Sequence, residues 1–337
     1  MPAHPIEVLL LCALPASGKS ETRKFLKSLT PEENLVKFRI GDTSTQCDDY
    51  PYVHMMRQID DALESFSAPR FFFEAADKGF KESADWGTLI EMVNEDFADL
   101  YSVAKKPEIK SAAEWLLNRY DAARTKVGVK SLFAGLDSEV VAKLSALIEE
   151  ECRGIFDEKY DAIPESLEGK TVVIEFARGG PHGSTFPLPE PFGYQYSFSR
   201  LSPLILERAA ILYVWVTPEQ SRAKNVARAM EKAGDPTTVA LSLNHGVPHA
   251  VMMGDYGCDD MVYLESVSGK PSTIKITCAA DKKDYFMPIG KFDNRDDKTT
   301  FARGPKAEWK TEDVAAISKG LEDAFKGLVE QYDAMKK

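Results

Sequence analysis

The feature that most constrains the fold is an apolar run near the amino terminus, followed directly by a loop of small residues and a helix start. The run spans Ile6–Cys12 and is apolar apart from Glu7. Apolar side chains on both faces are typical of a central parallel strand that helices cover on both sides. We therefore predict a buried strand of a parallel sheet here.

The loop after this strand matches the pattern (A/G)-x-x-x-x-G-K-(S/T), with Ala in the first position. Its residues are Ala13, Leu14, Pro15, Ala16, Ser17, Gly18, Lys19 and Ser20. A loop between a strand and a helix can surround a phosphate with backbone N–H groups, and the helix N-terminus also attracts the anion. In this pattern Gly18 allows close backbone approach, Lys19 neutralises β and γ oxygens, and the Ser20 hydroxyl ligates Mg²⁺. The sequence thus predicts a nucleotide site at residues 13–20.

On these residues the chain resembles the P-loop kinase superfamily, which includes nucleotide, nucleoside, gluconate and shikimate kinases. The resemblance covers Ile6–Leu29, and beyond it only the order of elements is similar. It implies a P-loop NTPase fold of the α/β class, with three α/β/α layers and a mainly parallel sheet. It also implies ATP and Mg²⁺ as cofactors and transfer of the γ-phosphoryl group to a small-molecule acceptor, such as a nucleoside, a nucleotide or a sugar-type hydroxyl.

Further apolar runs predict the other strands of the sheet. They are Leu35–Ile40, Arg70–Glu74, Thr171–Phe176 and Ala210–Val216, with shorter pieces at Met261–Glu265 and Thr273–Cys278. Helical stretches separate the first of these runs, and such βα alternation favours a parallel sheet.

Capping boxes at Thr30, Ser111 and Thr217 predict three helix starts, and an amphipathic pattern predicts a last helix over Glu312–Tyr332. Apolar residues recur at helical spacing between residues 83 and 153. We therefore predict a helical insertion at residues 83–165. Residues 1–82 and 166–337 would then form the two parts of the core, with a lid and the late strands in the second part.

Acids that follow predicted strands are candidates for acceptor activation and magnesium binding, because phosphoryl transfer needs both. Asp42 follows the run Leu35–Ile40, where similar kinases carry an acceptor-binding or magnesium-linked Asp, although a turn cap explains it equally well. Glu175 ends an apolar run at the sheet edge where ligands bind, and we assign it to magnesium. Glu74 and Asp77 compete for the same role.

Four arginines are candidates for binding the acceptor or stabilising the migrating charge. Arg178 precedes two glycines, and Arg57 ends a polar and aromatic stretch that begins at Asp48; both are assigned to the acceptor. Arg222 and Arg228 lie where similar kinases have an arginine-bearing lid, so either could act as an internal arginine finger. Ordinary surface ion pairs explain them about as well.

Two polar stretches late in the chain are candidates for site loops. Asn244–His249 combines Asn and His, and Asn294–Asp297 is similar to the guanine-reading N-K-x-D pattern with Arg in place of Lys. The second stretch leaves GTP open as the nucleotide. Because no D-x-x-G sequence occurs, a signalling GTPase is disfavoured.

The net charge and the cysteines limit the kinds of partner and the cellular location that we expect for this chain. The chain has 42 Lys and Arg against 53 Asp and Glu, a net charge of −11, which disfavours nucleic acid and anionic membranes as partners. Five scattered cysteines without a C-x-x-C pair suggest reduced thiols, and the start lacks a leader-like segment, so we expect a cytoplasmic protein. The alternatives to a kinase are a regulatory nucleotide-binding ATPase or GTPase and a polynucleotide kinase.

Overall fold

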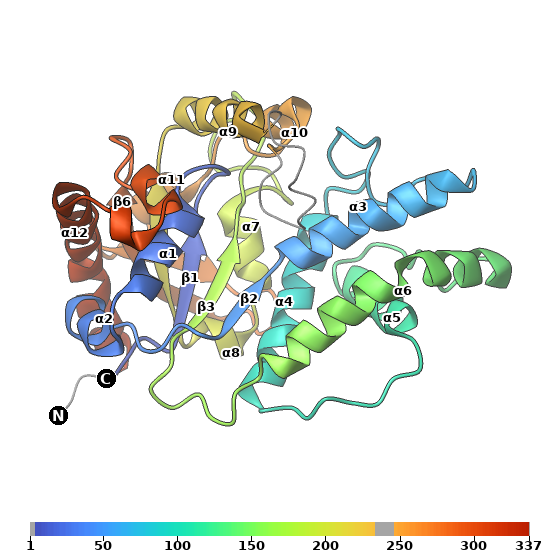
Figure 1. Ribbon diagram of the computed structural model, residues 1–337, viewed down its shortest axis with the longest axis horizontal. Helices are drawn as coiled ribbons and strands as arrows, with labels where there is room; N and C mark the ends of the chain where they lie inside the picture. Colours follow the sequence, from blue (N-terminus) through green and yellow to red (C-terminus); the bar gives the residue numbers. More distant parts are fainter. Residues whose placement is uncertain (1–3, 233–245, 337) are drawn as a thin grey trace.

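A six-stranded sheet forms the centre of the molecule (Figure 1). The computed structural model describes residues 4–232 and 246–336. Its strands are β1 (Val8–Cys12), β2 (Gln46–Asp48), β3 (Val172–Phe176), β4 (Ala209–Trp215), β5 (Thr273–Thr277) and β6 (Asp284–Asp293). They lie in the order β2-β3-β1-β4-β6-β5, and every pair is parallel except β5 with β6. The predicted α/β class with a mainly parallel sheet is therefore confirmed.

The strand register brings several chain segments to one edge of the sheet. Cys12 at the end of β1 pairs with Phe176 of β3 and with Tyr213 of β4. Asp48 at the end of β2 pairs with Glu175 of β3. Because these strands are parallel, the loops that leave their carboxyl ends meet at the same edge, which is where open α/β sheets bind ligands.

One face of the sheet is covered by helices from the two ends of the chain. These are α1 (Lys19–Ser28), α2 (Pro31–Phe38) and α12 (Thr311–Met335). Phe25 of α1, Phe38 of α2 and Phe325 of α12 lie in one apolar cluster with the β1 residues Leu9 and Leu11. Burial of this aromatic surface stabilises the layer.

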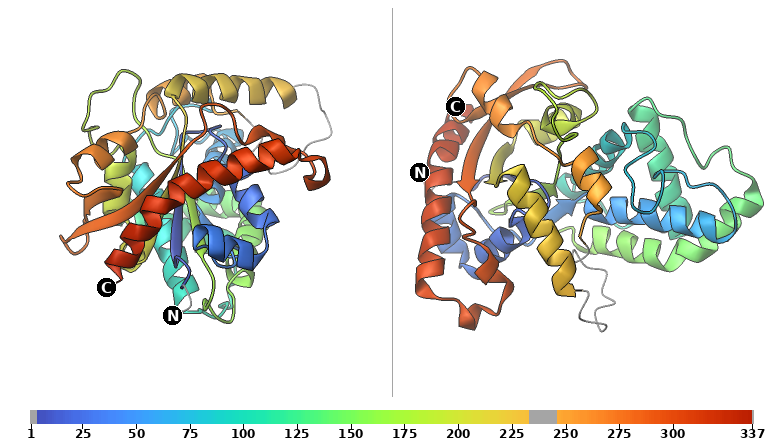
Figure 2. Two further views of the ribbon diagram at one scale, coloured as in Figure 1. Left: turned by 90° about the vertical axis from the view of Figure 1, so that its left-hand side faces the viewer. Right: turned by 90° about the horizontal axis from the view of Figure 1, so that it is seen from above.

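The other face is covered by helices from the middle of the chain, so the core has three layers (Figure 2). These are α4 (Asp85–Tyr101), α7 (Gly193–Arg200), α8 (Pro203–Leu206) and α11 (Met261–Val267). Val93 and Phe97 of α4 and Phe198 of α7 pack against Val8 and Leu10 of β1. Successive side chains of a strand point to opposite faces of the sheet. Val8 and Leu10 therefore lie in this second cluster, and Leu9 and Leu11 lie in the first.

A second apolar core lies beyond β2 and is formed by helices together with loop residues such as Phe72, Phe80 and Phe133. It joins α3 (Tyr50–Ser65), α5 (Ala112–Lys126), α6 (Ser138–Asp161) and the remaining face of α4. In the right-hand view of Figure 2 these helices extend to one side of the sheet. Two further helices, α9 (Pro218–Lys232) and α10 (His249–Gly254), lie together at the top of Figure 1.

The predicted helix starts are confirmed. At Thr30 and at Thr217 both hydrogen bonds of the capping box are present, and the Ser111 hydroxyl accepts from the Glu114 N–H. The predicted helical insertion contains α4, α5 and α6, and the predicted last helix is α12. Among the helices of the described residues, none is long and apolar enough to cross a membrane.

Three predicted strands are wrong, and local contacts explain why. Leu35–Ile40 falls largely in α2, since the Thr30 capping box starts a helix that continues through Phe38. Met261–Glu265 is the beginning of α11, whose buried Met261 and Leu264 are three residues apart, as on one helix face.

The third wrong strand, Arg70–Glu74, is irregular backbone. The buried carboxylate of Asp60 accepts hydrogen bonds from the N–H groups of Phe71, Phe72 and Phe73. These donors are therefore satisfied by a side chain instead of a neighbouring strand.

Candidate functional site

The loop of residues 13–20 connects β1 to α1 through two left-handed residues. Ala16 has φ 58° and Gly18 has φ 102°. A Cβ atom on Gly18 would lie 2.4 Å from Thr299 Oγ1 and 2.7 Å from Asn294 Nδ2. Both the backbone conformation and the crowding therefore require glycine at this position.

Side chains from three distant elements hold the carbonyl groups of this loop. The Tyr194 hydroxyl donates to Ala13 O at 3.1 Å, and Ser221 Oγ donates to Pro15 O at 2.7 Å. Asn294 Nδ2 donates to Ser17 O at 2.8 Å. Within the described residues, no hydrogen bond is donated by the main-chain N–H groups of residues 16–20. The loop is thus anchored through its acceptors, and its donors stay available.

A buried carboxylate faces the cation of the loop. Lys19 Nζ lies 3.6 Å from Glu175 Oε1, and Arg23 Nη1 lies 3.1 Å from Glu175 Oε2. Glu175 is the penultimate residue of β3, lies beside the loop and is only 5% exposed. The Ser20 side chain lines the same cavity. Lys19, Ser20 and Glu175 therefore come together as expected from the sequence.

Asp48, at the end of β2, places a second carboxylate next to Glu175. Its Oδ1 accepts from the Tyr50 N–H at 2.9 Å. Burial, and then the negative charges of Glu175 and Asp49, raise the pKa of Asp48 from 3.8 to about 7. A carboxyl group with a pKa near neutrality can accept or release a proton under ordinary conditions.

Arg178 lies in the wall opposite the loop and is 2% exposed. Its Nη1 contacts Asp49 Oδ2 and Ala177 O, both at 2.6 Å, and its Nε donates to Ser197 Oγ at 3.0 Å. The guanidinium carbon also lies 4.8 Å from the centre of the Trp86 ring. These contacts fix the arginine in place.

Helix α9 supplies the remaining wall. Arg228 Nη2 lies 3.5 Å from Glu21 Oε1, which Arg303 Nε also contacts at 2.8 Å. The Asn225 side chain exchanges two hydrogen bonds of 2.8 Å with the main chain of Val247.

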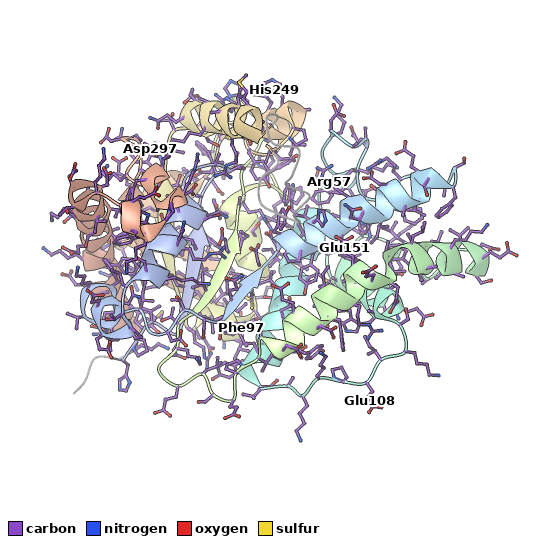
Figure 3. All side chains as sticks on the ribbon, viewed as in Figure 1. Arg57, Phe97, Glu108, Glu151, His249 and Asp297 are labelled. Carbon is purple, nitrogen blue, oxygen red and sulfur yellow. The ribbon has the colours of Figure 1, made fainter. Side chains whose placement is uncertain are left out.

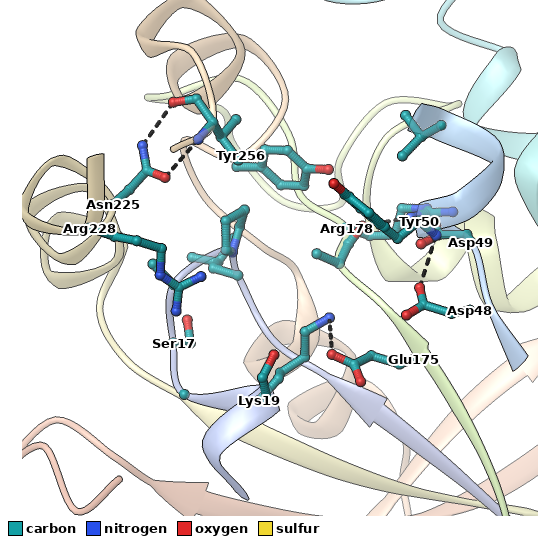
Figure 4. A pocket seen from close by; sticks show the side chains of 18 of the residues that line it. Ser17, Lys19, Asp48, Asp49, Tyr50, Glu175, Arg178, Asn225, Arg228 and Tyr256 are labelled. Atoms are coloured by element: carbon teal, nitrogen blue, oxygen red, sulfur yellow. Dashed lines mark hydrogen bonds and ion pairs between the residues drawn. The ribbon is translucent and has the colours of Figure 1, made fainter. Parts of the chain in front are cut away.

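These walls enclose one cavity, shown in Figure 4. Three cationic side chains, four carboxylates and a group of rings line it. The charged members are Lys19, Arg178, Arg228, Asp48, Asp49, Glu175 and Glu21, and the rings are Tyr50, Trp86 and Tyr256. Residues 14–20 form its floor.

Three residues that the sequence assigned to the site lie elsewhere. Asp42 precedes β2 and pairs with Lys170, which precedes β3, so it lies at the amino-terminal edge of the sheet. Its assignment rested on the wrong strand at Leu35–Ile40. Arg222 donates to Gly257 O and pairs with Glu219, and it does not line the cavity.

Arg57 is the third of these residues. It lies on α3 (Figure 3). It donates to the carbonyl groups of Ala76 and Lys78, and its guanidinium carbon lies 3.9 Å from the centre of the Phe73 ring. Burial lowers the pKa of its guanidinium. The competing candidates Glu74 and Asp77 also lie outside the cavity lining.

The two polar stretches late in the chain, predicted as site loops, differ in what the structure shows of them. Asn294 is fully buried and supports the loop, and Asp297 pairs with Lys224, so neither faces the cavity. In the stretch Asn244–His249, Asn244 and His245 lie outside the described residues.

The sequence analysis missed the aromatic side of the cavity and Asn225. Trp86 and Tyr256 reach the cavity from segments 170 residues apart, and no local pattern joins them. Asp48 and Tyr50 were recognised only as part of a longer polar stretch. The short length of β2, three residues, hid the strand that places them.

The donor set also bears on a metal ion. Among the described residues, no cluster of three or more His, Cys, Asp or Glu side chains is placed to hold one. Mg²⁺ commonly uses only one or two protein carboxylates together with substrate phosphates, and Ser20 with Glu175 fits that set. Comparisons with protein-family models, curated proteins and solved structures found no match.

Proposed function

We propose that this chain is an ATP- and Mg²⁺-dependent phosphotransferase of the P-loop type, with GTP as the alternative nucleotide. The observation that carries the proposal is the loop of residues 13–20. Its carbonyl groups are held from outside, its N–H groups are available, and Lys19 lines the cavity. Such an arrangement suits a polyphosphate.

Two further features fit a bound nucleotide. Ser17 Oγ is buried at the cavity floor without a hydrogen-bond partner, and a phosphate oxygen would satisfy it. Lys19 would exchange its 3.6 Å contact with Glu175 for phosphate oxygens. Glu175 and the Ser20 hydroxyl would then hold Mg²⁺, which supplies neutralisation of phosphate charge.

The remaining residues divide between the acceptor and the transferred group. An acceptor hydroxyl oxygen would form a bond to the γ-phosphorus while the bond from that phosphorus to the β–γ bridging oxygen breaks. The proton of the hydroxyl would pass to Asp48, which takes the role that the sequence gave to Asp42. Arg228 would stabilise the charge on the transferred group.

Titration with Mg-ATP tests the proposal. Lys19→Ala should weaken binding by about 10- to 100-fold, the expected effect of losing a hydrogen bond between charged groups. Lys27→Ala is a matched control, because it removes the same charge from an exposed position of the same helix. Equal affinities in the two variants, or no binding of Mg-ATP and Mg-GTP by folded wild-type protein, would contradict the proposal.

Turnover then separates transfer from hydrolysis. Label from γ-³²P-ATP should appear in a phosphorylated acceptor, and release of phosphate should increase when the right acceptor class is added. Fast hydrolysis that no acceptor changes would instead assign the chain to the regulatory ATPases.

A further inference from the structure

The acceptor half of the cavity differs in charge from the phosphate half. Figure 4 shows Lys19, Ser17 and Arg228 around the loop, with Arg178, Asp49 and Tyr50 on the opposite side. Resting on the function proposed above, we infer that the acceptor is an uncharged or cationic hydroxyl compound with a flat ring, and not a phosphate ester or a sugar acid.

The cation of the acceptor half is already neutralised. Arg178 pairs with Asp49, and three of its donor contacts go to Asp49, Ala177 and Ser197. The remaining nitrogen, Nη2, makes no hydrogen bond and has no contact with solvent. An anionic group on the acceptor would have to compete with the Asp49 carboxylate for this guanidinium.

The other arginine predicted to bind an anionic acceptor also uses its donors for contacts within the protein. Arg57 donates to the main-chain carbonyls of Ala76 and Lys78 and stacks on Phe73. It is absent from the cavity lining, so Arg178, which already pairs with Asp49, is the cation that the described residues place in the acceptor half.

Acids dominate what the acceptor would contact. Asp48 faces the cavity and forms no ion pair with any described residue, and Asp49 lies beside it. A phosphate or carboxylate on the acceptor would therefore lie near Asp48, which pairs directly with no cation of the described residues. Like charges in such positions act against binding, whereas a hydroxyl or ammonium group can donate to them.

The rings define the rest of the surface. Trp86 and Tyr256 meet edge to face, with centroids 5.7 Å apart, and Tyr50 and Val53 complete this wall. Aromatic faces bind flat rings, and they also attract cations. The same wall therefore accepts a nucleoside-like base or a ring that carries an amine.

Matched pairs of acceptors test this inference. Binding of a nucleoside and its 5′-monophosphate, and of an amino sugar, a neutral sugar and a sugar acid, would be measured by calorimetry in the presence of a non-hydrolysable Mg-ATP analogue. We expect an uncharged or cationic member to bind about tenfold or more tightly than its anionic counterpart. Tighter binding of the monophosphate or the sugar acid, or no binding of any uncharged or cationic member, would overturn it. Since the analogue must bind for the assay to work, failure of the proposed nucleotide site would be seen separately.

Variants locate the source of the preference. Asp48→Asn should reduce the preference for the uncharged member about tenfold, and Trp86→Leu should weaken the ring compound in both charge states. Asp42→Asn makes the same charge change at the opposite edge of the sheet and should leave the preference unchanged. An unchanged preference in Asp48→Asn would show that the carboxylate is not its source.

Discussion

Replacement of Gly18 by Ala is the sharpest test of how the loop of residues 13–20 is built. The substitution has two separate physical effects. An L-residue at φ 102° is strained by about 1–2 kcal/mol. The new methyl group would also lie 2.4 Å from Thr299 Oγ1 and 2.7 Å from Asn294 Nδ2, so both side chains would have to move.

The second effect can be assigned a magnitude from the hydrogen bonds that would break. Asn294 Nδ2 donates to Ser17 O and to Thr299 Oγ1. Each bond contributes about 0.5–1.5 kcal/mol net, so losing both adds about 1–3 kcal/mol. We expect Gly18→Ala to lower the free energy of unfolding by about 2–5 kcal/mol in total.

Gly128→Ala provides the matched control. Gly128 has φ 80°, and no atom lies within 4 Å of a Cβ built on it, so this variant carries the backbone strain without the crowding. Urea denaturation followed by circular dichroism would compare the two. Gly18→Ala should be the less stable by about 1–3 kcal/mol and should bind Mg-ATP more weakly than Gly128→Ala. Equal losses of stability would refute the reasoning that Asn294 and Thr299 press against Gly18.

Three other changes test the wider structure. Asp42→Ala should change the free energy of unfolding by less than about 1 kcal/mol, because the ion pair of Asp42 with Lys170 is half exposed. The variant should also keep its affinity for Mg-ATP. A tenfold loss of affinity would show that Asp42 belongs to the site. Burial raises the pKa of Asp259 from 3.8 to about 7, so the folded state binds more protons than the unfolded state in this range and stability falls as pH rises through it. Asp259→Asn should reduce that fall by about 4 kcal/mol in unfolding measured from pH 4 to 8, and curves parallel to wild type would contradict the assignment. Arg124→Met leaves the buried carboxylate of Asp85 without its cation and should destabilise the protein by about 3–5 kcal/mol. Hydrogen exchange in α4 and α5 should become faster. Exchange protection equal to that of the wild type would count against a buried ion pair between these two residues.

The central part of the fold could be predicted from the sequence because local signals agree with tertiary structure there. The run that forms β1 is apolar on both faces, and both of its faces are buried. The acid at the end of β3 was found for the same reason, since a buried strand ending in Glu175 is visible as a pattern.

The second strand could not be predicted, because β2 has only three residues and one of them is exposed. The sequence offered the more apolar Leu35–Ile40 instead, and this error led to Asp42, at the opposite edge of the sheet, as the predicted acid. The capping box at Thr30 already indicated a helix over part of that run. Where a cap and an apolar run disagree, the cap was the better guide in this chain.

The wall of the cavity that contains Asp49 and Arg178 could not be predicted, because its residues meet only in three dimensions. Asp49 and Arg178 are 129 residues apart, and no local sequence pattern indicates that their charges pair. In the sequence, each of these charged residues suggested contact with a ligand, whereas in the structure the two form an ion pair with each other.

The anchoring of the first loop makes the proposed nucleotide site depend on residues that lie far along the chain. The donors that hold its carbonyl groups are 181, 206 and 277 residues further along. A growing polypeptide that has passed the ribosome only as far as α9 would contain the glycine and the lysine but would still lack Asn294. Affinity for the nucleotide should consequently develop late in synthesis, and the ligand would stabilise the finished molecule without trapping its incomplete forms.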